Sequence, residues 1–264
     1  MKKHFLLLLP VALLLPGLAL AQSAFVGTWK ADLNNNIQLP KKPNVYLLAA
    51  GVYHCKTCAP PWSVPADGQD HKVTGHPYFD SAAIVVVDDH TITETDKKAG
   101  KTVTTVTSKV SADGSTLSYD VSDSSASSGA PVKVKGESAR VAKGAAGSHA
   151  ISGSWRATKF DSVSDNGLMT TWALDGSTLK MSTPTGQSYA APLDGTDSPF
   201  TGDPGQTSVS MKKVDDRTID ETDKRNGKVI GSARLSVSAD GKTMMIAWKD
   251  MLHGTNGSFT NIKQ

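Results

Sequence analysis

The chain contains Val87-Asp88-Asp89-His90-Thr91-Ile92 and repeats it 127 residues later as Val214-Asp215-Asp216-Arg217-Thr218-Ile219. The match extends without a gap over residues 67–123 and 194–250, with 25 identities in 57 aligned positions. A period of this length indicates a duplicated domain rather than a solenoid of short repeats. Each copy therefore provides an independent view of one fold.

Short strand-like segments alternate with tight turns in both copies. In the second copy, Asn226-Gly227 and Asp240-Gly241 are strong signals for hairpin turns. About eight strands fit into this copy, and no helical periodicity interrupts them. A meander of that length must curl or close to remove its edges. The sequence thus predicts an all-β fold class, with two tandem antiparallel up-and-down β-barrels that arose by internal duplication.

The N-terminus has the pattern of a secretory signal peptide. Lys2 and Lys3 precede an apolar run from Phe5 to Leu20, and Ala19-Leu20-Ala21 forms a small-x-small cleavage site. We therefore expect a periplasmic or secreted protein. The predicted division is a signal peptide at 1–21, a first barrel at 22–143, a linker at 144–149 and a second barrel at 150–264.

Charge and hydropathy exclude several classes of partner. Without Lys2 and Lys3 the chain has 26 basic and 25 acidic residues, and no long block of like charge. Nucleic acid and anionic lipid are therefore not expected as partners. No second apolar stretch is long enough to span a bilayer, and no Cys follows the predicted cut, so we expect no stable membrane anchor after cleavage.

Each copy opens with a Gly-x-Trp motif: Gly27-Thr28-Trp29-Lys30 in the first and Gly153-Ser154-Trp155-Arg156 in the second. On the first strand of a meander, this motif resembles the lipocalin signature. The chain as a whole resembles a group of secreted bacterial lipocalin-like proteins with a tandem Gly-x-Trp start. The resemblance implies that Trp29 and Trp155 plug the barrels, with Arg140 and Lys263 of the closing strands packed over them. We expect these indoles to be core and to contact no ligand.

The only two cysteines form the motif Cys55-Lys56-Thr57-Cys58. Haem attachment would need a His where Ala59 stands. Zinc would need further ligands, for which His54, His71 and His76 are candidates, and a redox motif would need a helix after the first Cys. In an oxidising compartment a local structural disulfide is the favoured interpretation, and we predict no cofactor and no metal.

The densest group of polar and aromatic residues is His71-Lys72-Val73-Thr74-Gly75-His76-Pro77-Tyr78. Its counterpart at 198–205 keeps the turn residues but neither His. An aromatic and polar rim is typical of a binding mouth. The candidate ligand-binding residues are therefore Tyr53, Trp62, His71, His76 and Tyr78.

Two acidic residues recur on one face of a repeated strand, as Ile92-x-Glu94-x-Asp96 and Ile219-x-Glu221-x-Asp223. The period of two puts the carboxyl groups on the side of the Ile. They point either into a polar cavity or into solvent beyond the barrel body. We favour solvent, because hairpin tips project and neighbouring lysines can screen the charges.

No motif of a nucleophilic, metal-dependent or phosphate-binding enzyme is present. The sequence favours a non-enzymatic binding protein for small apolar or amphipathic ligands held in barrel cavities. One alternative is an envelope structural or protein- or glycan-interaction module with filled barrels. Another is an enzyme at the barrel mouth that uses His71, His76 and a nearby acid.

Overall fold

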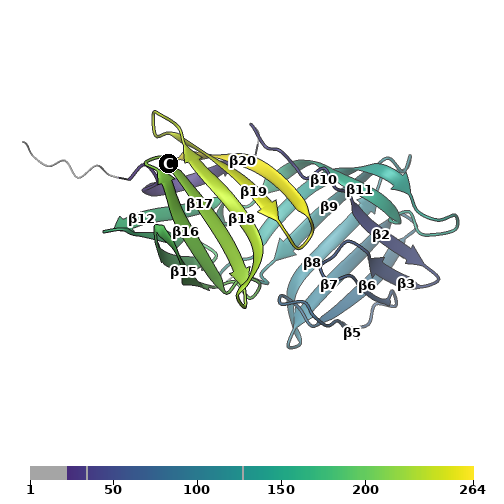
Figure 1. Cartoon of the computed structure of the whole chain (residues 1–264). Coiled ribbons are helices and arrows are strands. Elements are labelled where there is room, and N and C mark those ends of the chain that lie inside the picture. Colours follow the sequence, from purple (N-terminus) through teal and green to yellow (C-terminus); the bar gives the residue numbers. More distant parts are fainter. Residues whose placement is uncertain (1–22, 34, 127) are drawn as a thin grey trace, which may run out of the picture.

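The computed structural model describes residues 23–33, 35–126 and 128–264 (Figure 1). Its regular structure is almost entirely antiparallel strand, arranged in two ten-stranded sheets that lie side by side. One sheet is a closed barrel and the other is nearly closed, which confirms the predicted all-β class with two barrels. The predicted signal peptide at 1–21 lies outside the described residues.

The first barrel is a continuous run of chain, with strand order β4-β3-β2-β11-β10-β9-β8-β7-β6-β5. Its edges approach each other just after β4, where the Gly68 amide donates to the Ile84 carbonyl at 2.9 Å. Its strands are β2 (Asn44–Ala49), β3 (Val52–Cys55), β4 (Trp62–Pro65), β5 (His71–Lys72), β6 (Ser81–Asp88), β7 (Thr91–Lys98), β8 (Lys101–Val110), β9 (Thr116–Asp123), β10 (Val132–Lys143) and β11 (Gly153–Val163).

The second barrel is closed, and its circle joins the two ends of the chain. It consists of the last nine strands together with the N-terminal strand β1, which pairs with both β12 and β20. Its strands are β1 (Gly27–Asp32), β12 (Met169–Asp175), β13 (Thr178–Ser182), β14 (Ser188–Pro192), β15 (Asp194–Thr201), β16 (Ser208–Asp215), β17 (Thr218–Arg225), β18 (Lys228–Val237), β19 (Thr243–Asp250) and β20 (Thr255–Lys263).

The two copies have therefore exchanged their opening strands. The Gly-x-Trp strand of the first copy, β1, closes the second barrel, and that of the second copy, β11, pairs with β10 and β2 in the first barrel. The boundaries expected from the sequence, 22–143 and 150–264, follow the duplication, whereas the sheets cross those boundaries. Residues 144–149 are likewise no linker between barrels, because they join β10 to β11 within one sheet. Of the described residues, 35–43 and the 3-10 turn η1 (Asp165–Gly167) lie where the chain passes between the barrels.

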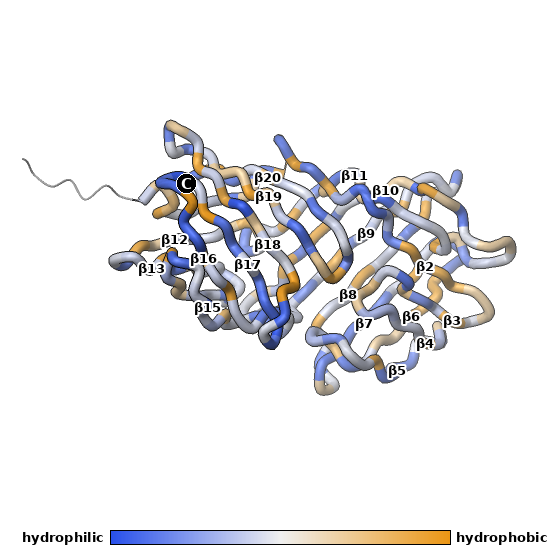
Figure 2. Tube along the Cα trace, viewed as in Figure 1, coloured by the Kyte–Doolittle hydropathy of each residue, from blue (hydrophilic) through white to orange (hydrophobic). Residues whose placement is uncertain are grey.

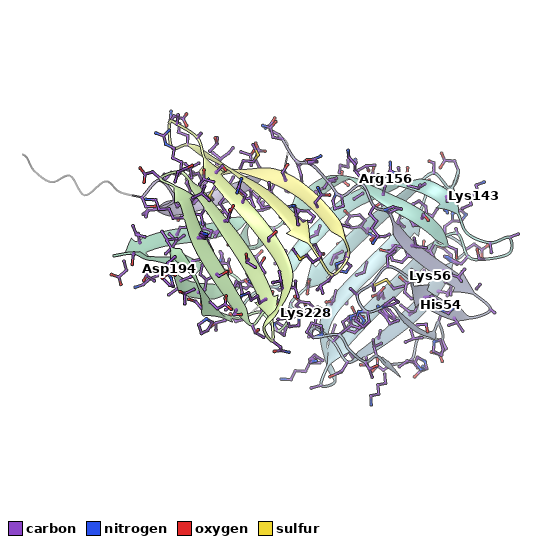
Figure 3. The ribbon with its side chains drawn as sticks, in the orientation of Figure 1. His54, Lys56, Lys143, Arg156, Asp194 and Lys228 are labelled. Carbon is purple, nitrogen blue, oxygen red and sulfur yellow. A yellow bond between two sulfur atoms is a disulfide. The ribbon has the colours of Figure 1, made fainter. Side chains whose placement is uncertain are left out.

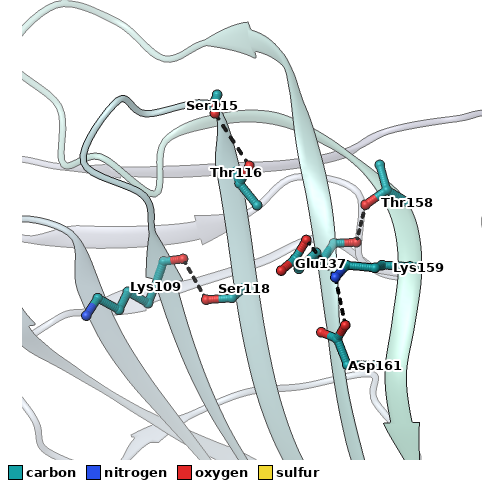
Figure 4. A network of polar contacts seen from close by, with 8 residues as sticks. All are labelled: Lys109, Ser115, Thr116, Ser118, Glu137, Thr158, Lys159 and Asp161. Carbon is teal, nitrogen blue, oxygen red and sulfur yellow. Dashed lines mark hydrogen bonds and ion pairs between the residues drawn. The ribbon is translucent and has the colours of Figure 1, made fainter.

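Consecutive pairing explains the exchange. Strands β10 and β11 follow each other through a short loop and form a long antiparallel ladder, and such local pairing has a low loop-closure cost. Figure 4 shows side chains that tie this pair together on its outer face. Lys159 on β11 reaches Glu137 on β10 at 3.3 Å and Asp161 at 2.8 Å. With β11 in the first barrel, β1 remains to fill the gap between β12 and β20.

The interiors follow the predicted alternation of apolar and polar residues, as the hydropathy colouring in Figure 2 shows along the strands. Each barrel has its own core cluster, and the positions repeat at the offset of 127: Ile92 and Ile219 are both buried, as are Val110 and Val237. Among the described residues, no helix is long and apolar enough to cross a membrane.

Candidate ligand chamber

A chamber of about 670 Å³ lies where the open ends of the two barrels meet. Most of its wall belongs to the second barrel, from Trp172 on β12 round to Phe259 on β20. The first barrel contributes Glu94 and two loops that reach across the opening. These contributions are Cys58, Ala59, Trp62, His76, Pro77, Tyr78, Phe79 and Glu94. The chamber is thus shared, and neither barrel forms it alone.

Direct contacts hold the two mouths together. The Tyr78 hydroxyl donates to Asp203 Oδ1 at 3.0 Å, and the Ser128 amide donates to the Thr185 carbonyl at 2.9 Å. The hydroxyl end of the Tyr78 ring approaches Gly205 so closely that an added Cβ would collide with the tyrosine oxygen. Gly205 is the counterpart of Tyr78 at the offset of 127, so equivalent loops of the two copies meet here.

The chamber is lined mainly by aromatic and aliphatic side chains. The chain has 16 Trp, Tyr and Phe residues, and eight of them contribute to this one wall. A wall of this kind is typical of small-molecule sites, where apolar area provides affinity and a few polar groups set orientation. The eight are Trp62, Tyr78, Phe79, Trp172, Tyr189, Phe200, Trp248 and Phe259.

Two carboxyl groups of β17 point into the chamber from the second barrel. Glu221 Oε2 accepts a hydrogen bond from the Tyr189 hydroxyl at 3.0 Å, and Asp223 Oδ1 accepts one from Gln206 Nε2 at 2.6 Å. Burial raises the pKa of Glu221 to about 8, and the neighbouring Asp223 adds to the shift. Burial raises the pKa of Asp223 as well. A carboxyl group shielded from water holds its proton more tightly because the charged form loses hydration.

The first barrel repeats this arrangement on β7. Burial raises the pKa of Glu94 to about 8, with a further contribution from Asp96, while the Tyr53 hydroxyl bonds to the same carboxyl group. Burial, with the nearby Asp123, raises the pKa of Asp96 to about 7. Asp96 is only 6 % exposed, and its Oδ1 atom has no hydrogen-bond partner among the described residues.

Inward-facing carboxyl groups correct the sequence-based interpretation, which favoured solvated hairpin tips. At the positions of the acids, the strands β7 and β17 still lie within the barrel body. The face that carries the buried Ile92 and Ile219 therefore points inward there too, and the acids on that face point inward with it. The signal was present in the sequence, because both acids keep the period of two with a buried Ile in both copies. The flanking lysines that were expected to screen them bond outward instead, as Lys97 does with Asp70 at 2.6 Å.

Basic side chains stand at the rim of the chamber and not in its depth. Arg225 and Lys249 lie at the mouth end of β17 and β19, and the Arg225 Nε donates to the Gly205 carbonyl. A neighbouring groove continues outward along the Cys55–Cys58 loop and contains Lys42 and Lys56. In Figure 3, Lys56 is labelled beside the yellow disulfide of the first barrel.

The five candidate ligand-binding residues divide into three groups. Trp62, His76 and Tyr78 line the chamber. Tyr53 lies behind that wall, 3 % exposed, with its ring centroid 5.5 Å from that of Trp62. His71 lies outside the chamber, where its Nε2 meets Asp67 Oδ1 at 2.8 Å.

Of the two histidines, only His76 faces the chamber. Its ring stacks on Phe79 with centroids 4.7 Å apart, and its Nε2 atom has no hydrogen-bond partner among the described residues. Burial lowers the pKa of His76, and the charges of Arg225 and His253 act in the same direction. The side chain therefore favours its neutral form. Because His71 lies elsewhere, the two histidines do not form one catalytic pair.

Because the opening strands are exchanged, each plug tryptophan packs against the basic residue of the other copy. Arg140 Cζ lies 3.9 Å from the ring centroid of Trp155, and Lys263 Nζ lies 5.2 Å from that of Trp29. Both indoles are buried, and each donates its Nε1 hydrogen at 2.8 Å to a carbonyl four residues earlier. Neither Trp lines the chamber, because both lie at the opposite, closed ends.

Cys55 and Cys58 form a disulfide, with Cα atoms 5.5 Å apart. Cys58 lines the chamber, so the bridge fixes the loop that carries part of the rim. Among the described residues, no group of three or more His, Cys, Asp or Glu side chains is arranged to hold a metal ion. No protein-family model matches the chain, and a search of curated proteins found no match.

Proposed function

We propose that this chain is a secreted or periplasmic, non-enzymatic binding protein that holds a small apolar or amphipathic ligand between its two barrel mouths. The supporting observation is the shared chamber, with about 670 Å³ of space and half of the aromatic residues of the chain in its wall. That volume falls within the range of ligand pockets, about 300–1,000 Å³. The proposal includes kinship with secreted lipocalin-like proteins, supported by the two Gly-x-Trp strands and their basic partners.

The chamber argues against the alternative of filled barrels. A module that only presents its loops to a protein or glycan has no need for an apolar interior space, because filling it with side chains would increase stability. The space also differs from a pore, since the closed ends hold Trp29 and Trp155. An enzyme would need reactive groups at bonding distance, and the separation of His71 from His76 removes the pair that suggested one.

A variant that fills the chamber tests the proposal. Ala233 on β18 faces the chamber, whereas Ala247 on the adjacent strand β19 is exposed on the outer face. We expect Ala233→Trp to abolish binding of decanol, measured by quenching of tryptophan fluorescence or by calorimetry. The matched control Ala247→Trp adds the same side chain outside and leaves binding unchanged.

Native mass spectrometry of the mature protein from its own host complements this test. The proposal predicts a co-purifying small molecule, which is released on denaturation and absent from Ala233→Trp. A bare mass, together with no binding of decanol by the wild type, would contradict the function. Equal decanol binding by the wild type and Ala233→Trp would contradict the site.

A further inference from the structure

The four inward carboxyl groups have no cationic partner in the described chain. Eleven ion pairs occur among the described residues, and none includes Glu94, Asp96, Glu221 or Asp223. Buried acids are normally paired, because isolating a carboxylate from water is costly. Here the same unpaired acids occur in both copies, and three of the four, Glu94, Glu221 and Asp223, line one chamber.

A second observation concerns the hydrogen bonding of one of these acids. Asp96 is more than nine-tenths buried, on the inward face of β7 beside the chamber residue Glu94, and its Oδ1 atom lacks a hydrogen-bond donor among the described residues. An orphaned buried oxygen is rare in folded proteins and calls for a partner. In the second barrel the equivalent Asp223 has Gln206 on one oxygen and faces the chamber.

The aromatic wall provides the third element. Tyr189 stands between Trp172 and Phe200, with ring centroids 5.9 Å and 5.7 Å away, and its hydroxyl reaches Glu221. Ring faces attract a cation, and a carboxyl group beside them supplies the counter-charge. An apolar wall with these two features suits an ammonium group attached to a hydrocarbon body.

We propose that the chamber selects organic cations, namely amphipathic ligands whose ammonium group lies against Glu221 and Asp223 and whose apolar body lies along the aromatic wall. This inference rests on the proposed function and specifies the ligand class. An anionic ligand of the same shape would bring its charge beside these carboxyl groups, which like-charge repulsion disfavours. The cations of the protein stand at the rim, where Arg225 and Lys249 remain within reach of water.

Binding should be linked to protons. The raised pKa values of Glu94 and Glu221, both about 8, mean that these two carboxyl groups hold protons at neutral pH while the chamber is empty. A bound cation favours the carboxylate form, so a proton passes to the buffer and affinity for a fixed-charge cation increases with pH. The other titratable or charged groups around the pair are Glu94, Asp203, Asp250, Arg225, Lys249, His76, His253, Tyr78 and Tyr189.

Three probes of equal chain length test the selection: decyltrimethylammonium, decanol and decanoate, titrated calorimetrically into the mature protein below their micelle concentrations. At pH 8 we expect decyltrimethylammonium to bind at least about tenfold more tightly than decanoate. Between pH 6 and pH 8 its affinity should increase, with proton release visible as a dependence of the heat on buffer ionisation.

Matched variants locate the charge. The double variant Glu221→Gln/Asp223→Asn should lose the preference for decyltrimethylammonium and its pH dependence but still bind decanol, which shows that the chamber is intact. Asp220→Asn, which removes an outward acid of the same strand, should change neither. Tight binding of decanoate, or a preference unaffected by the double variant, would overturn the inference. Binding of decanol without decyltrimethylammonium would refute the cation selection alone, whereas binding of no probe would refute the proposed function itself.

Discussion

The first and second barrels descend from one sequence, but the larger cavity opens into the second: the first encloses about 280 Å³ beside Trp155, whereas the chamber at the second has about 670 Å³. The pairing register places Tyr53 of the first barrel at the level of Leu179 in the second. Tyr53 stacks on Tyr46 with centroids 6.2 Å apart and also packs on Trp62, so large rings occupy the part of the first interior that adjoins the chamber wall. The second barrel thus forms most of the chamber wall, and the first barrel contributes loops that cover part of its opening. The difference shows that two copies of a duplicated fold can have the same strands but cavities of different volume, because the side chains at equivalent inward positions differ in size.

The largest expected effect concerns which strands belong together. A fragment of residues 36–166 contains β2 to β11, so we expect it to fold and to form its disulfide. A fragment of residues 22–149 lacks β11 and carries β1 without its partners, so it should fail to fold. Far-UV circular dichroism and amide chemical-shift dispersion distinguish the two fragments. A folded 22–149 beside an unfolded 36–166 would refute the strand exchange.

A second prediction concerns the plugs. Trp29→Ala and Trp155→Ala each remove a fully buried indole, for which a loss of about 3–5 kcal/mol in the free energy of unfolding is expected. The strand exchange determines which strands each substitution destabilises. Hydrogen exchange should accelerate in β12 and β20 for Trp29→Ala, and in β2 and β10 for Trp155→Ala. The reverse assignment would show that each Trp plugs the barrel of its own copy.

Much of this architecture can be predicted from the sequence. The offset of 127, the hairpin turns and the period of two indicate two meanders, because these features are local. The strand exchange is not marked in the same way, since β1 and β11 carry the same Gly-x-Trp motif and either barrel can accept either strand. Sequential pairing of β10 with β11 was the available clue.

The chamber was harder to predict than the fold. Trp62, His76 and Tyr78 stood out as a rim because aromatic and polar residues gather there. Their partners, such as Trp172 and Phe259, are separated from them by about a hundred residues or more, and only the facing of the two mouths brings them together. The sequence places the acids on the same strand face as Ile92 and Ile219. The period of two does not tell whether that face is buried or exposed to solvent at the acids, because the spacing is the same in both cases.

A third prediction uses pH to compare the interiors. Unfolded Glu side chains ionise near pH 4.5, whereas Glu94 and Glu221 keep their protons until about pH 8 in the folded protein. Between these values the folded state binds more protons, so the free energy of unfolding decreases as the pH rises. Glu221→Gln and Glu94→Gln should each flatten this slope, as measured by urea titrations from pH 5 to pH 8.

A matched control for the pH slope is Asp220→Asn. Asp220 points outward on β17, and its bond to Arg234 keeps its pKa below the usual range, so it does not titrate in that interval. An unfolding free energy that increased from pH 5 to pH 8 in the wild type would contradict the burial of the acids.

The smallest predicted effect concerns the disulfide, which only the first barrel has, so its removal should affect that barrel and leave the second unchanged. Closing a loop of this short length stabilises by about 2 kcal/mol in the chain-entropy description. Replacing both Cys55 and Cys58 by Ser should therefore lower the unfolding free energy by about that amount and loosen the rim at Trp62. Hydrogen exchange in β17 and β18 should remain unchanged, and faster exchange there would show that the bridge supports both barrels.

The most direct test of the shared chamber is the stoichiometry of binding. Isothermal titration of the protein with decanol should give one site per chain, because the two mouths enclose a single space. The same titration with Ala233→Trp should give none. Two equivalent sites per chain would contradict the account, since they would mean that each barrel binds its own ligand.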